Sequence, residues 1–143
     1  MSQLELGRAA LLDGLTGSWN RRMAQRVATA ELRRSSRTGR RFAVAMLDLD
    51  HFKSLNDTFG YSAGDDVLVR FAEIIRETLR PEDWLFRLGG EEFAILIVHA
   101  GVHEADAILD RIRAKVTAEV PFAGTRALTF SAGITQHDPT AFP

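Results

Sequence analysis

Apolar residues in this chain follow two kinds of spacing. Continuous apolar runs rich in branched and aromatic residues predict strands of a sheet at four places: residues 42–47, 84–86, 93–98 and 127–135. Apolar residues three and four positions apart predict three long helices, over about residues 18–36, 65–79 and 104–120. A short helix is expected over residues 51–56, and a glycine or proline follows each long helix, where helices commonly end.

The order of these elements is helix, strand, helix, helix, hairpin, helix, strand. Few strands among many helices predict an α+β sandwich, with one mixed or mostly antiparallel central sheet flanked by helices. Ser18 or Asn20 is expected to cap the first long helix, and residues 56–65 are predicted to form a polar loop. Residues 2–12 are expected to form a short amphipathic piece, and residues 137–143 to lack regular structure. At 143 residues, without repeats or linkers, the chain is expected to form one domain.

Two glycines and two glutamates separate the second and third predicted strands. Gly89-Gly90 is a hairpin signal, because glycine accepts the positive φ of a tight turn and lets a ligand approach the backbone. Glu91 and Glu92 are then expected at the start of the following strand, at the hairpin tip. Adjacent carboxylates repel each other, which a nearby cation would relieve. The alternative is a solvated hairpin whose glutamates face water.

The first predicted strand carries two aspartates at its carboxyl end, where ligands commonly bind in sheets flanked by helices. We assign Asp48 a functional role. Asp50 shares its face if the strand extends that far, because side chains alternate with a period of two. We favour instead a role for Asp50 as the cap of the helix over residues 51–56.

Composition and charge narrow the possible classes of protein. Apolar residues make up 45% and charged residues 26% of the chain, near the averages of globular proteins. The net charge of −1 gives no overall attraction to nucleic acid or to an anionic membrane. No apolar run approaches the roughly 20 residues of a membrane span, and no signal peptide is recognisable, so a cytoplasmic location is expected. Without cysteine there can be no disulfide or thiolate site, and the carboxylates favour a hard cation such as Mg²⁺.

The first long helix is rich in arginine. Its basic residues are Arg21, Arg22, Arg26, Arg33, Arg34 and Arg37. This helix could face phosphates, but we favour a solvated basic face.

Asp48 at a strand end can meet Glu91 and Glu92 at a hairpin tip if the two segments are neighbours in the sheet. Such a carboxylate cluster can hold one or two Mg²⁺ ions, which clamp the oxygens of a displacement at phosphorus. Lys53 could neutralise a transferring phosphate, and the amide groups that open the short helix could bind it. The residues therefore predict nucleotidyl transfer. The sequence contains no Gly-Lys-Ser/Thr phosphate loop, which argues against P-loop hydrolysis.

Several motifs in matching order and spacing closely resemble the GGDEF family of diguanylate cyclases, in the Gly-Gly-Glu-Glu-Phe variant. They lie at residues 13–22, 48–57, 59–65, 89–93 and 131–134. The resemblance runs over most of the chain. It divides the chain into an N-terminal segment with the basic helix, residues 1–39, and a catalytic core, residues 40–143.

The resemblance implies a fold like the palm of nucleotidyl cyclases and polymerases. It implies condensation of two GTP molecules into cyclic di-GMP, with release of two pyrophosphates and one GTP half-site on each protomer of a homodimer. The implied ligands of Mg²⁺, or of Mn²⁺, are Asp48, the Leu49 carbonyl, Glu91 and Glu92. One glutamate, for which we favour Glu91, would help to deprotonate the ribose 3′-hydroxyl.

The resemblance also implies roles for residues around this centre. The implied substrate-binding residues are Phe52 and Lys53 at the phosphates, Asn56 and Asp65 at guanine, and Gly89 and Gly90 in the turn. Arg80 and Asp83 match an Arg-x-x-Asp site for product inhibition, with Arg87 and Arg111 as supporting arginines.

The chain departs from the family pattern at three places. The usual C-terminal helix, with an Ala-Asp-x-Ala-Leu-Tyr-x-Ala-Lys pattern and Gly-Arg-Asn, is not found before Pro143, and it normally supplies a lysine and an arginine to the triphosphate. Tyr61 replaces the usual histidine and Ser18 the usual leucine. The first departure favours an alternative function, a receptor module that binds cyclic di-GMP or GTP without useful turnover. A third possibility is a structural interaction domain, and a sensory domain in a longer protein is an expected partner.

Overall fold

The computed structural model describes residues 7, 10–122 and 126–140. Its helices are α2 (Arg21–Thr38), α3 (Phe52–Phe59), α4 (Tyr61–Thr78) and α5 (Val102–Glu119). Its strands are β1 (Phe42–Leu49), β2 (Trp84–Gly89), β3 (Glu92–Val98), β4 (Pro121–Phe122), β5 (Arg126–Ala127) and β6 (Phe130–His137). Most of the amphipathic piece predicted at residues 2–12 lies outside the described residues.

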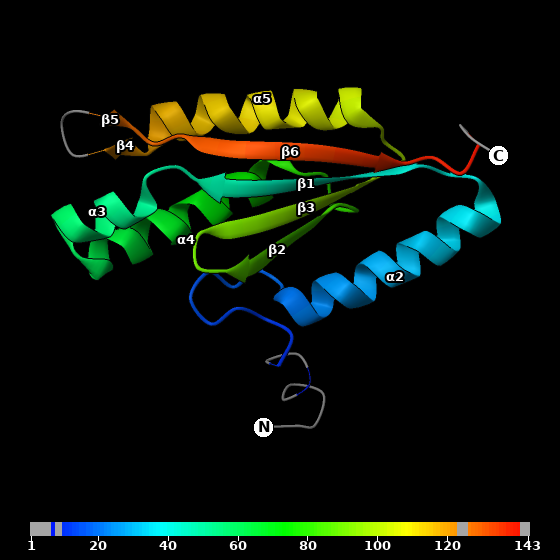
Figure 1. Ribbon diagram of the computed structural model, residues 1–143, viewed down its shortest axis with the longest axis horizontal. Helices are drawn as coiled ribbons and strands as arrows, with labels where there is room; N and C mark the ends of the chain where they lie inside the picture. The colour runs from blue at the N-terminus through cyan, green and yellow to red at the C-terminus, as the bar shows by residue number, and fades with distance from the viewer. Residues whose placement is uncertain (1–6, 8–9, 123–125, 141–143) are drawn as a thin grey trace.

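Four strands form one antiparallel sheet in the order β2-β3-β1-β6 (Figure 1). The carboxyl end of β1 and the turn between β2 and β3 lie at the same edge of this sheet (Figure 1). The apolar run that forms β1 was predicted to be buried on both faces. That prediction holds for the first half of the strand but is wrong for the second, where Met46 is 47% exposed and Asp48 is also exposed.

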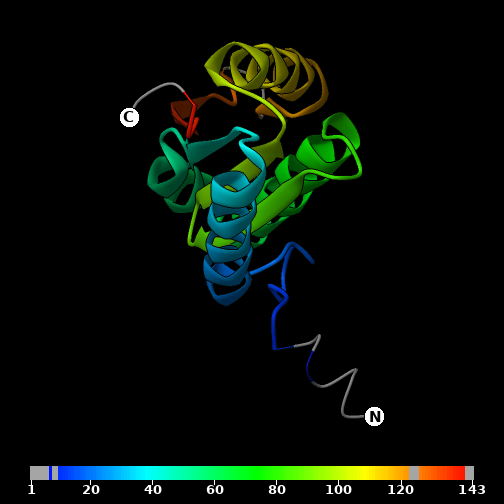
Figure 2. The ribbon, with the colours of Figure 1, turned by 90° about the vertical axis from the view of Figure 1, so that its right-hand side faces the viewer.

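Helices cover both faces of the sheet, but unequally (Figures 1 and 2). α3, α4 and α5 enclose the main core on one face, where Phe71 is fully buried between Phe93 and Phe130. Among the described helices, α2 is the one that packs on the opposite face, through a smaller cluster that includes Val27 and Phe86. The exposed second half of β1 leaves an accessible surface beside its last residues.

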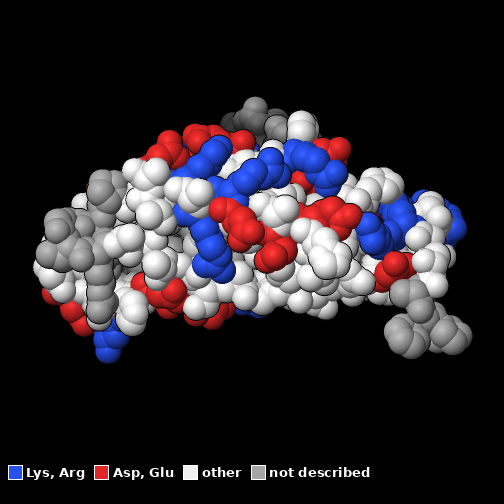
Figure 3. Space-filling view, turned by 90° about the horizontal axis from the view of Figure 1, so that it is seen from above, with Lys and Arg blue, Asp and Glu red and all other residues white. Residues whose placement is uncertain are grey.

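This architecture confirms the predicted α+β fold, an antiparallel central sheet flanked by helices. Among the described residues, no helix combines the length and the apolar character that crossing a membrane requires. On the side of the molecule that carries α5, acidic and basic side chains are interspersed (Figure 3). That side therefore does not present a large surface of a single charge.

The ends of α2 follow the sequence closely. The Asn20 side chain accepts a hydrogen bond from the Met23 amide at 3.1 Å, so Asn20 rather than Ser18 is the cap. Gly39 ends the helix with a φ of 78°, a conformation that glycine adopts without strain. The six arginines of α2 are all exposed, so the solvated basic face favoured from the sequence stays a prediction.

The predicted polar loop over residues 56–65 is wrong. α3 continues to Phe59 and α4 begins at Tyr61, so only Gly60, with a φ of 91°, separates the two helices. Gly64 lies in the first turns of α4, where a Cβ atom would stand only 1.8 Å from the Asn56 Oδ1 atom of α3. The glycines in this segment therefore bring two helices together instead of forming a loop.

The end of the chain also differs from its prediction. β6 begins at Phe130 and includes His137, later at both ends than the expected strand. Arg126–Ala127 pairs instead with Pro121–Phe122 in a separate two-stranded sheet that was not predicted.

Candidate active site

Asp48 and Glu92 lie directly opposite each other on the neighbouring strands β1 and β3. Residues that face each other in this way have Cβ atoms about 4.5–5.5 Å apart. Glu91 lies in the turn before β3, and its carbonyl accepts a hydrogen bond from the Leu49 amide at 3.3 Å. The structure therefore brings Asp48, Leu49, Glu91 and Glu92 together, as the sequence predicted for a carboxylate site.

The Asp48 carboxylate is in an unfavourable electrostatic environment for a negative charge. Burial, Glu91 and Asp50 all raise the pKa of Asp48 above its ordinary value. No described residue donates a hydrogen bond to this carboxylate that would offset the repulsion. A cation at this position would stabilise the ionised form of Asp48.

The donor set at this edge suits Mg²⁺ when a substrate is present. Among the described residues, no group of three or more acidic or histidine side chains is close enough to hold a metal ion alone. Mg²⁺, however, commonly keeps several waters and binds one or two carboxylates together with substrate phosphates. Asp48 and Glu92 provide such a pair of hard oxygen donors at an exposed position.

The turn that carries Glu91 is held by arginines. The Arg87 guanidinium donates two hydrogen bonds to the Gly90 carbonyl, at 3.0 and 2.8 Å. Arg21 of α2 donates to the Leu88 carbonyl at 3.3 Å. Because Gly89 and Gly90 have φ values of 153° and 48°, the turn needs glycine at both positions, and the arginines restrict its freedom.

Arg87 also joins this turn to the segment before α2. It contacts both oxygens of the Asp13 carboxylate, at 3.0 and 3.1 Å. Burial raises the pKa of Asp13, but hydrogen bonds from Thr16 and Arg87 outweigh burial and hold that pKa below its ordinary value. This pair could not be predicted from the sequence, because its members are 74 positions apart.

α3 and α4 form a narrow contact beside the carboxylate site. Asn56 has a buried Oδ1 atom with no hydrogen-bond partner among the described residues. Both this atom and the Phe52 ring lie against Gly64. Lys53 and Asp65 are exposed on the same two helices. An unpaired buried oxygen is costly, so a ligand that donates a hydrogen bond to Asn56 would be stabilised here.

Asp50 does not cap α3, so that prediction is wrong. The helix is preceded by His51, which has a φ of 57° and makes no capping hydrogen bond through its side chain. The Asp50 carboxylate instead accepts hydrogen bonds from the hydroxyl groups of Thr129 and Ser131, at 2.8 and 2.6 Å. The hydrogen bond from Ser131 is the largest of the effects that lower the pKa of Asp50.

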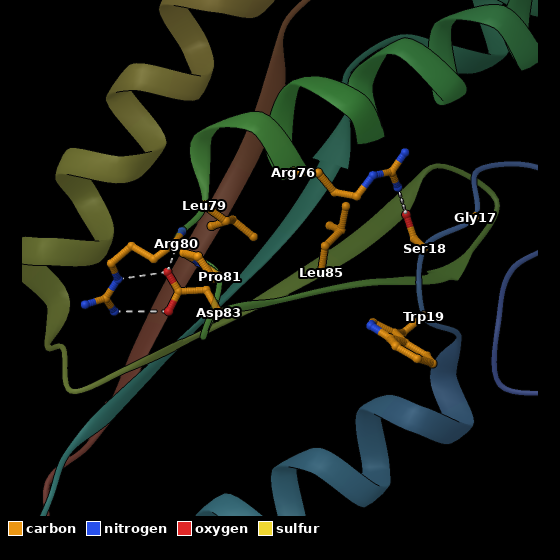
Figure 4. A pocket seen from close by; sticks show the side chains of 9 residues that line it. All are labelled: Gly17, Ser18, Trp19, Arg76, Leu79, Arg80, Pro81, Asp83 and Leu85. Atoms are coloured by element: carbon orange, nitrogen blue, oxygen red, sulfur yellow. Dashed lines mark hydrogen bonds and ion pairs between the residues drawn. The ribbon is translucent and has the colours of Figure 1, made fainter. Parts of the chain in front are cut away.

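Arg80 and Asp83 form a preorganised pair at a second place. The Arg80 guanidinium makes two hydrogen bonds to the Asp83 carboxylate, both at 3.0 Å, and a third to the Val98 carbonyl. The pair lines a cavity of about 330 Å³ that Ser18, Trp19 and other residues complete (Figure 4). Figure 4 shows the Arg80–Asp83 pair on one side of this cavity and Arg76, bonded to Ser18, on the other.

The two supporting arginines predicted for this second place do not line the cavity. Arg87 is bonded to Asp13 and Gly90 as described above. Arg111 is exposed on α5, and no hydrogen bond or ion pair joins it to a described residue. Their roles in product binding remain predictions.

Residues 10–141 match the family model described as the diguanylate cyclase GGDEF domain. The chain belongs to this family. The match includes the carboxylate site, the α3–α4 contact and the Arg80–Asp83 pair.

Curated relatives agree with this assignment to the GGDEF family. The diguanylate cyclase DgcP of Pseudomonas aeruginosa is 41% identical over 129 residues, which cover 88% of this chain and 19% of that protein. The diguanylate cyclase DgcS of Shewanella oneidensis is 38% identical over 112 residues, which cover 78% of this chain and 38% of that protein. This GGDEF domain thus spans less than two fifths of the length of either relative.

Solved structures of GGDEF proteins share the fold. The coiled coil and GGDEF domain of DgcB from Caulobacter crescentus, in complex with c-di-GMP, superposes with a TM-score of 0.88 at 29% identity, covering 96% of this chain and 74% of that one. The diguanylate cyclase SiaD of Pseudomonas aeruginosa, in complex with its activator SiaC, gives a TM-score of 0.85 at 40% identity, covering 94% of this chain and 52% of that one.

Proposed function

We propose that this GGDEF domain is a diguanylate cyclase, which condenses two GTP molecules into cyclic di-GMP and releases two pyrophosphates. The observation that carries the proposal is the direct opposition of Asp48 and Glu92, with Glu91 in the adjoining turn. The membership of the family and the relatives named as diguanylate cyclases support it.

Asp48, the Leu49 carbonyl, Glu91 and Glu92 would hold Mg²⁺ or Mn²⁺. Such an ion, when bound with substrate, neutralises phosphate charge and orients the oxygens of an in-line displacement. Glu91, in the exposed turn, is the residue that we assign to accept the proton of the ribose 3′-hydroxyl. The turn is restrained by Arg87 and Arg21, which favours a fixed position for this carboxylate.

We assign guanine recognition to the contact between α3 and α4. The buried Asn56 Oδ1 atom lacks a donor, and a guanine amino or ring N–H group would supply one. Asp65, next to the closely packed Gly64, would accept a second hydrogen bond from the base. Lys53 and the amide groups at the start of α3 would contact the phosphates, with Phe52 beneath them.

A Gly64→Ala variant is expected to weaken GTP binding more than it lowers stability. The added Cβ would meet the Asn56 Oδ1 atom at 1.8 Å and must displace this flexible side chain, which we assign to guanine. Loss of one such hydrogen bond corresponds to roughly a 3- to 10-fold rise in KM for GTP. Steady-state kinetics would measure it, and Ala63→Gly on the same helix is the control. An unchanged KM would contradict the assignment of Asn56.

The reaction needs two half-sites, and one chain provides one carboxylate site among its described residues. We therefore propose that two copies meet face to face, each holding one GTP. The test is to incubate the chain with GTP and Mg²⁺ over a range of protein concentrations and to separate the nucleotides by chromatography. A rate of cyclic di-GMP formation that rises more steeply than protein concentration is expected. No product at high concentration, while cyclic di-GMP still binds, would favour the receptor function instead.

The Arg80–Asp83 pair favours a product-binding site besides the cyclase site. The pair is formed in advance, and the Asp83 side chain is fully buried, so Arg80 is held in one position beside an open cavity. Arginine with a fixed geometry is suited to phosphate, and cyclic di-GMP carries two. DgcB, the solved structure described above, contains c-di-GMP.

Replacing Arg80 by alanine is expected to relieve product inhibition. Loss of a charge-assisted contact to phosphate should weaken cyclic di-GMP binding by about 10- to 100-fold. Calorimetric titration and the inhibition constant of the cyclase reaction would measure it, with Arg70→Ala on α4 as a control in another ion-pair group. Because Arg80 also bonds to Asp83 and Val98, the melting temperature of the Arg80→Ala variant must be measured as well. Unchanged product inhibition in a folded variant would contradict this role and show that residues 80–83 form only a turn.

A further inference from the structure

We propose that Asp50 is a positioning residue of the metal site: it binds the hydroxyl groups of Thr129 and Ser131 and thereby fixes the end of β1 and leaves the Asp48 carboxylate open. This inference rests on the proposed function, because it concerns the metal that Asp48 would bind. Asp50 itself was expected to be a helix cap.

Asp50 uses both oxygens of its carboxylate on the neighbouring strand segment. Oδ2 accepts from the Thr129 hydroxyl at 2.8 Å, and Oδ1 accepts from the Ser131 hydroxyl at 2.6 Å. The Asp50 amide also donates to the Thr129 carbonyl at 2.9 Å. Three hydrogen bonds therefore connect the chain just beyond Asp48 to the beginning of β6.

Ser131 is the residue that faces Asp48 across the β1–β6 pair. Its hydroxyl lies on the same face of the sheet as the Asp48 carboxylate, because directly opposed residues share a face. A free hydroxyl there could hydrogen-bond to Asp48 and occupy one of its oxygens. The contact with Asp50 engages this hydroxyl, and no described residue donates a hydrogen bond to Asp48.

The segment that Asp50 binds is itself anchored from the other side. Arg113 of α5 donates to the Phe130 carbonyl at 2.6 Å and lies over the Phe130 ring, 4.3 Å from its centroid. On the opposite flank, the Leu49 amide donates to the Glu91 carbonyl. Residues 48–50 are thus held between β6 and the turn that carries Glu91, so the spacing between Asp48 and the glutamates is restrained from both sides.

The geometry distinguishes the two aspartates by what their oxygens bind. Both oxygens of Asp50 accept hydrogen bonds from hydroxyl groups, whereas those of Asp48 accept none from the described residues. The hydrogen bonds of Asp50 are exposed to solvent and so contribute little to overall stability. Asp50 is therefore placed to hold a ligand-bearing segment in position and not to bind the ion itself.

The test measures binding of Mn²⁺ in the presence of a non-hydrolysable GTP analogue, by electron paramagnetic resonance, alongside the melting temperature. The double variant Thr129→Val/Ser131→Ala is expected to weaken Mn²⁺ binding by about 10- to 100-fold, the usual effect of removing groups that orient metal ligands. Its melting temperature should stay close to that of the unaltered chain. The matched control is Thr29→Val/Ser36→Ala on α2, which removes the same two hydroxyl groups from an exposed surface.

Two further variants keep the proposal open to contradiction. Ser131→Thr retains the hydroxyl and should bind Mn²⁺ like the unaltered chain. In an Asp50→Asn background, Ser131→Ala should have a smaller effect than it has alone, because the two residues act through one contact. Unchanged Mn²⁺ affinity in the Thr129→Val/Ser131→Ala variant would overturn the proposal. A second result would also overturn it: the Asp50→Asn variant loses the bound ion while the Thr129→Val/Ser131→Ala variant binds Mn²⁺ with normal affinity. That result would make Asp50 a direct ligand.

Failure of the proposed function gives a different result from failure of this inference. If the unaltered chain binds Mn²⁺ with the analogue but forms no cyclic di-GMP, the cyclase proposal fails while the role of Asp50 is still measured by affinity. If it forms cyclic di-GMP and the hydroxyl variants bind Mn²⁺ normally, only the role of Asp50 is refuted.

Discussion

Replacing Glu92 by glutamine is expected to lower the rate of cyclic di-GMP formation by about a thousandfold or more while leaving the fold intact. Glu92 stands directly opposite Asp48, so the substitution would remove the charge of one of the two opposed oxygen donors. A thousandfold lower rate corresponds to a loss of about 4 kcal/mol of transition-state stabilisation. This is within the range that a metal ion contributes to phosphoryl transfer. The initial rate with GTP and saturating Mg²⁺ is the measurement.

The fold should survive because Glu92 is exposed at the start of β3 and makes no hydrogen bond through its side chain that is needed for packing. Replacing this exposed carboxylate by an amide of the same shape should leave the melting temperature unchanged. Glu91→Gln tests the adjoining carboxylate in the same way, and Glu119→Gln on α5 is the control for loss of an exposed glutamate. Full activity in both Glu91→Gln and Glu92→Gln would refute the metal assignment.

The central site could be predicted because it depends on patterns that are local in the sequence. Apolar runs placed β1 and β3, and the two glycines placed the turn between β2 and β3. Once those strands are antiparallel neighbours, the end of β1 meets the start of β3, and Asp48 lies opposite Glu92. The family motifs and the physical pattern therefore pointed to the same residues.

The errors arose where contacts between distant residues overrode local preference. Asp50 precedes a helix and has a strong capping propensity, but hydroxyl groups 79 and 81 positions away bind its carboxylate. Glycines 60 and 64 indicated a loop, yet Gly64 serves close packing of α4 against Asn56 of α3. Neither the register of β6 nor the approach of two helices is visible in a single sequence.

The Asp13–Arg87 pair shows a further limit of sequence reasoning. Asp13 belongs to the first family motif and Arg87 was expected to be a supporting arginine of the product site, but nothing in the sequence indicated that the two residues meet. In the structure, one guanidinium joins the segment before α2 to the Gly90 carbonyl. A displacement of that segment would therefore move Arg87 and, through it, the turn that carries Glu91.

The largest effect on stability is expected for Arg40→Ala, which should lower the free energy of unfolding by about 3–5 kcal/mol. Glu31 of α2 is only 4% exposed, and Arg40 contacts its carboxylate through two nitrogen atoms, at 3.1 and 3.0 Å. Removing the arginine would leave a buried carboxylate whose other hydrogen-bond partner among the described residues, Arg34, is at the limit of hydrogen-bond distance, 3.5 Å. Urea denaturation followed by circular dichroism is the measurement.

The adjacent Arg41 provides the matched control. Its pair with Glu104 is short, 2.6 Å, but both side chains are nearly half exposed, so Arg41→Ala should cost at most about 1 kcal/mol. Because the cost at Arg40 comes from an unpaired buried charge and not from the pair itself, replacing Glu31 and Arg40 together by leucine should be less destabilising than Arg40→Ala alone. Equal losses at Arg40 and Arg41 would show that burial of Glu31 does not govern the stability of α2 on the sheet.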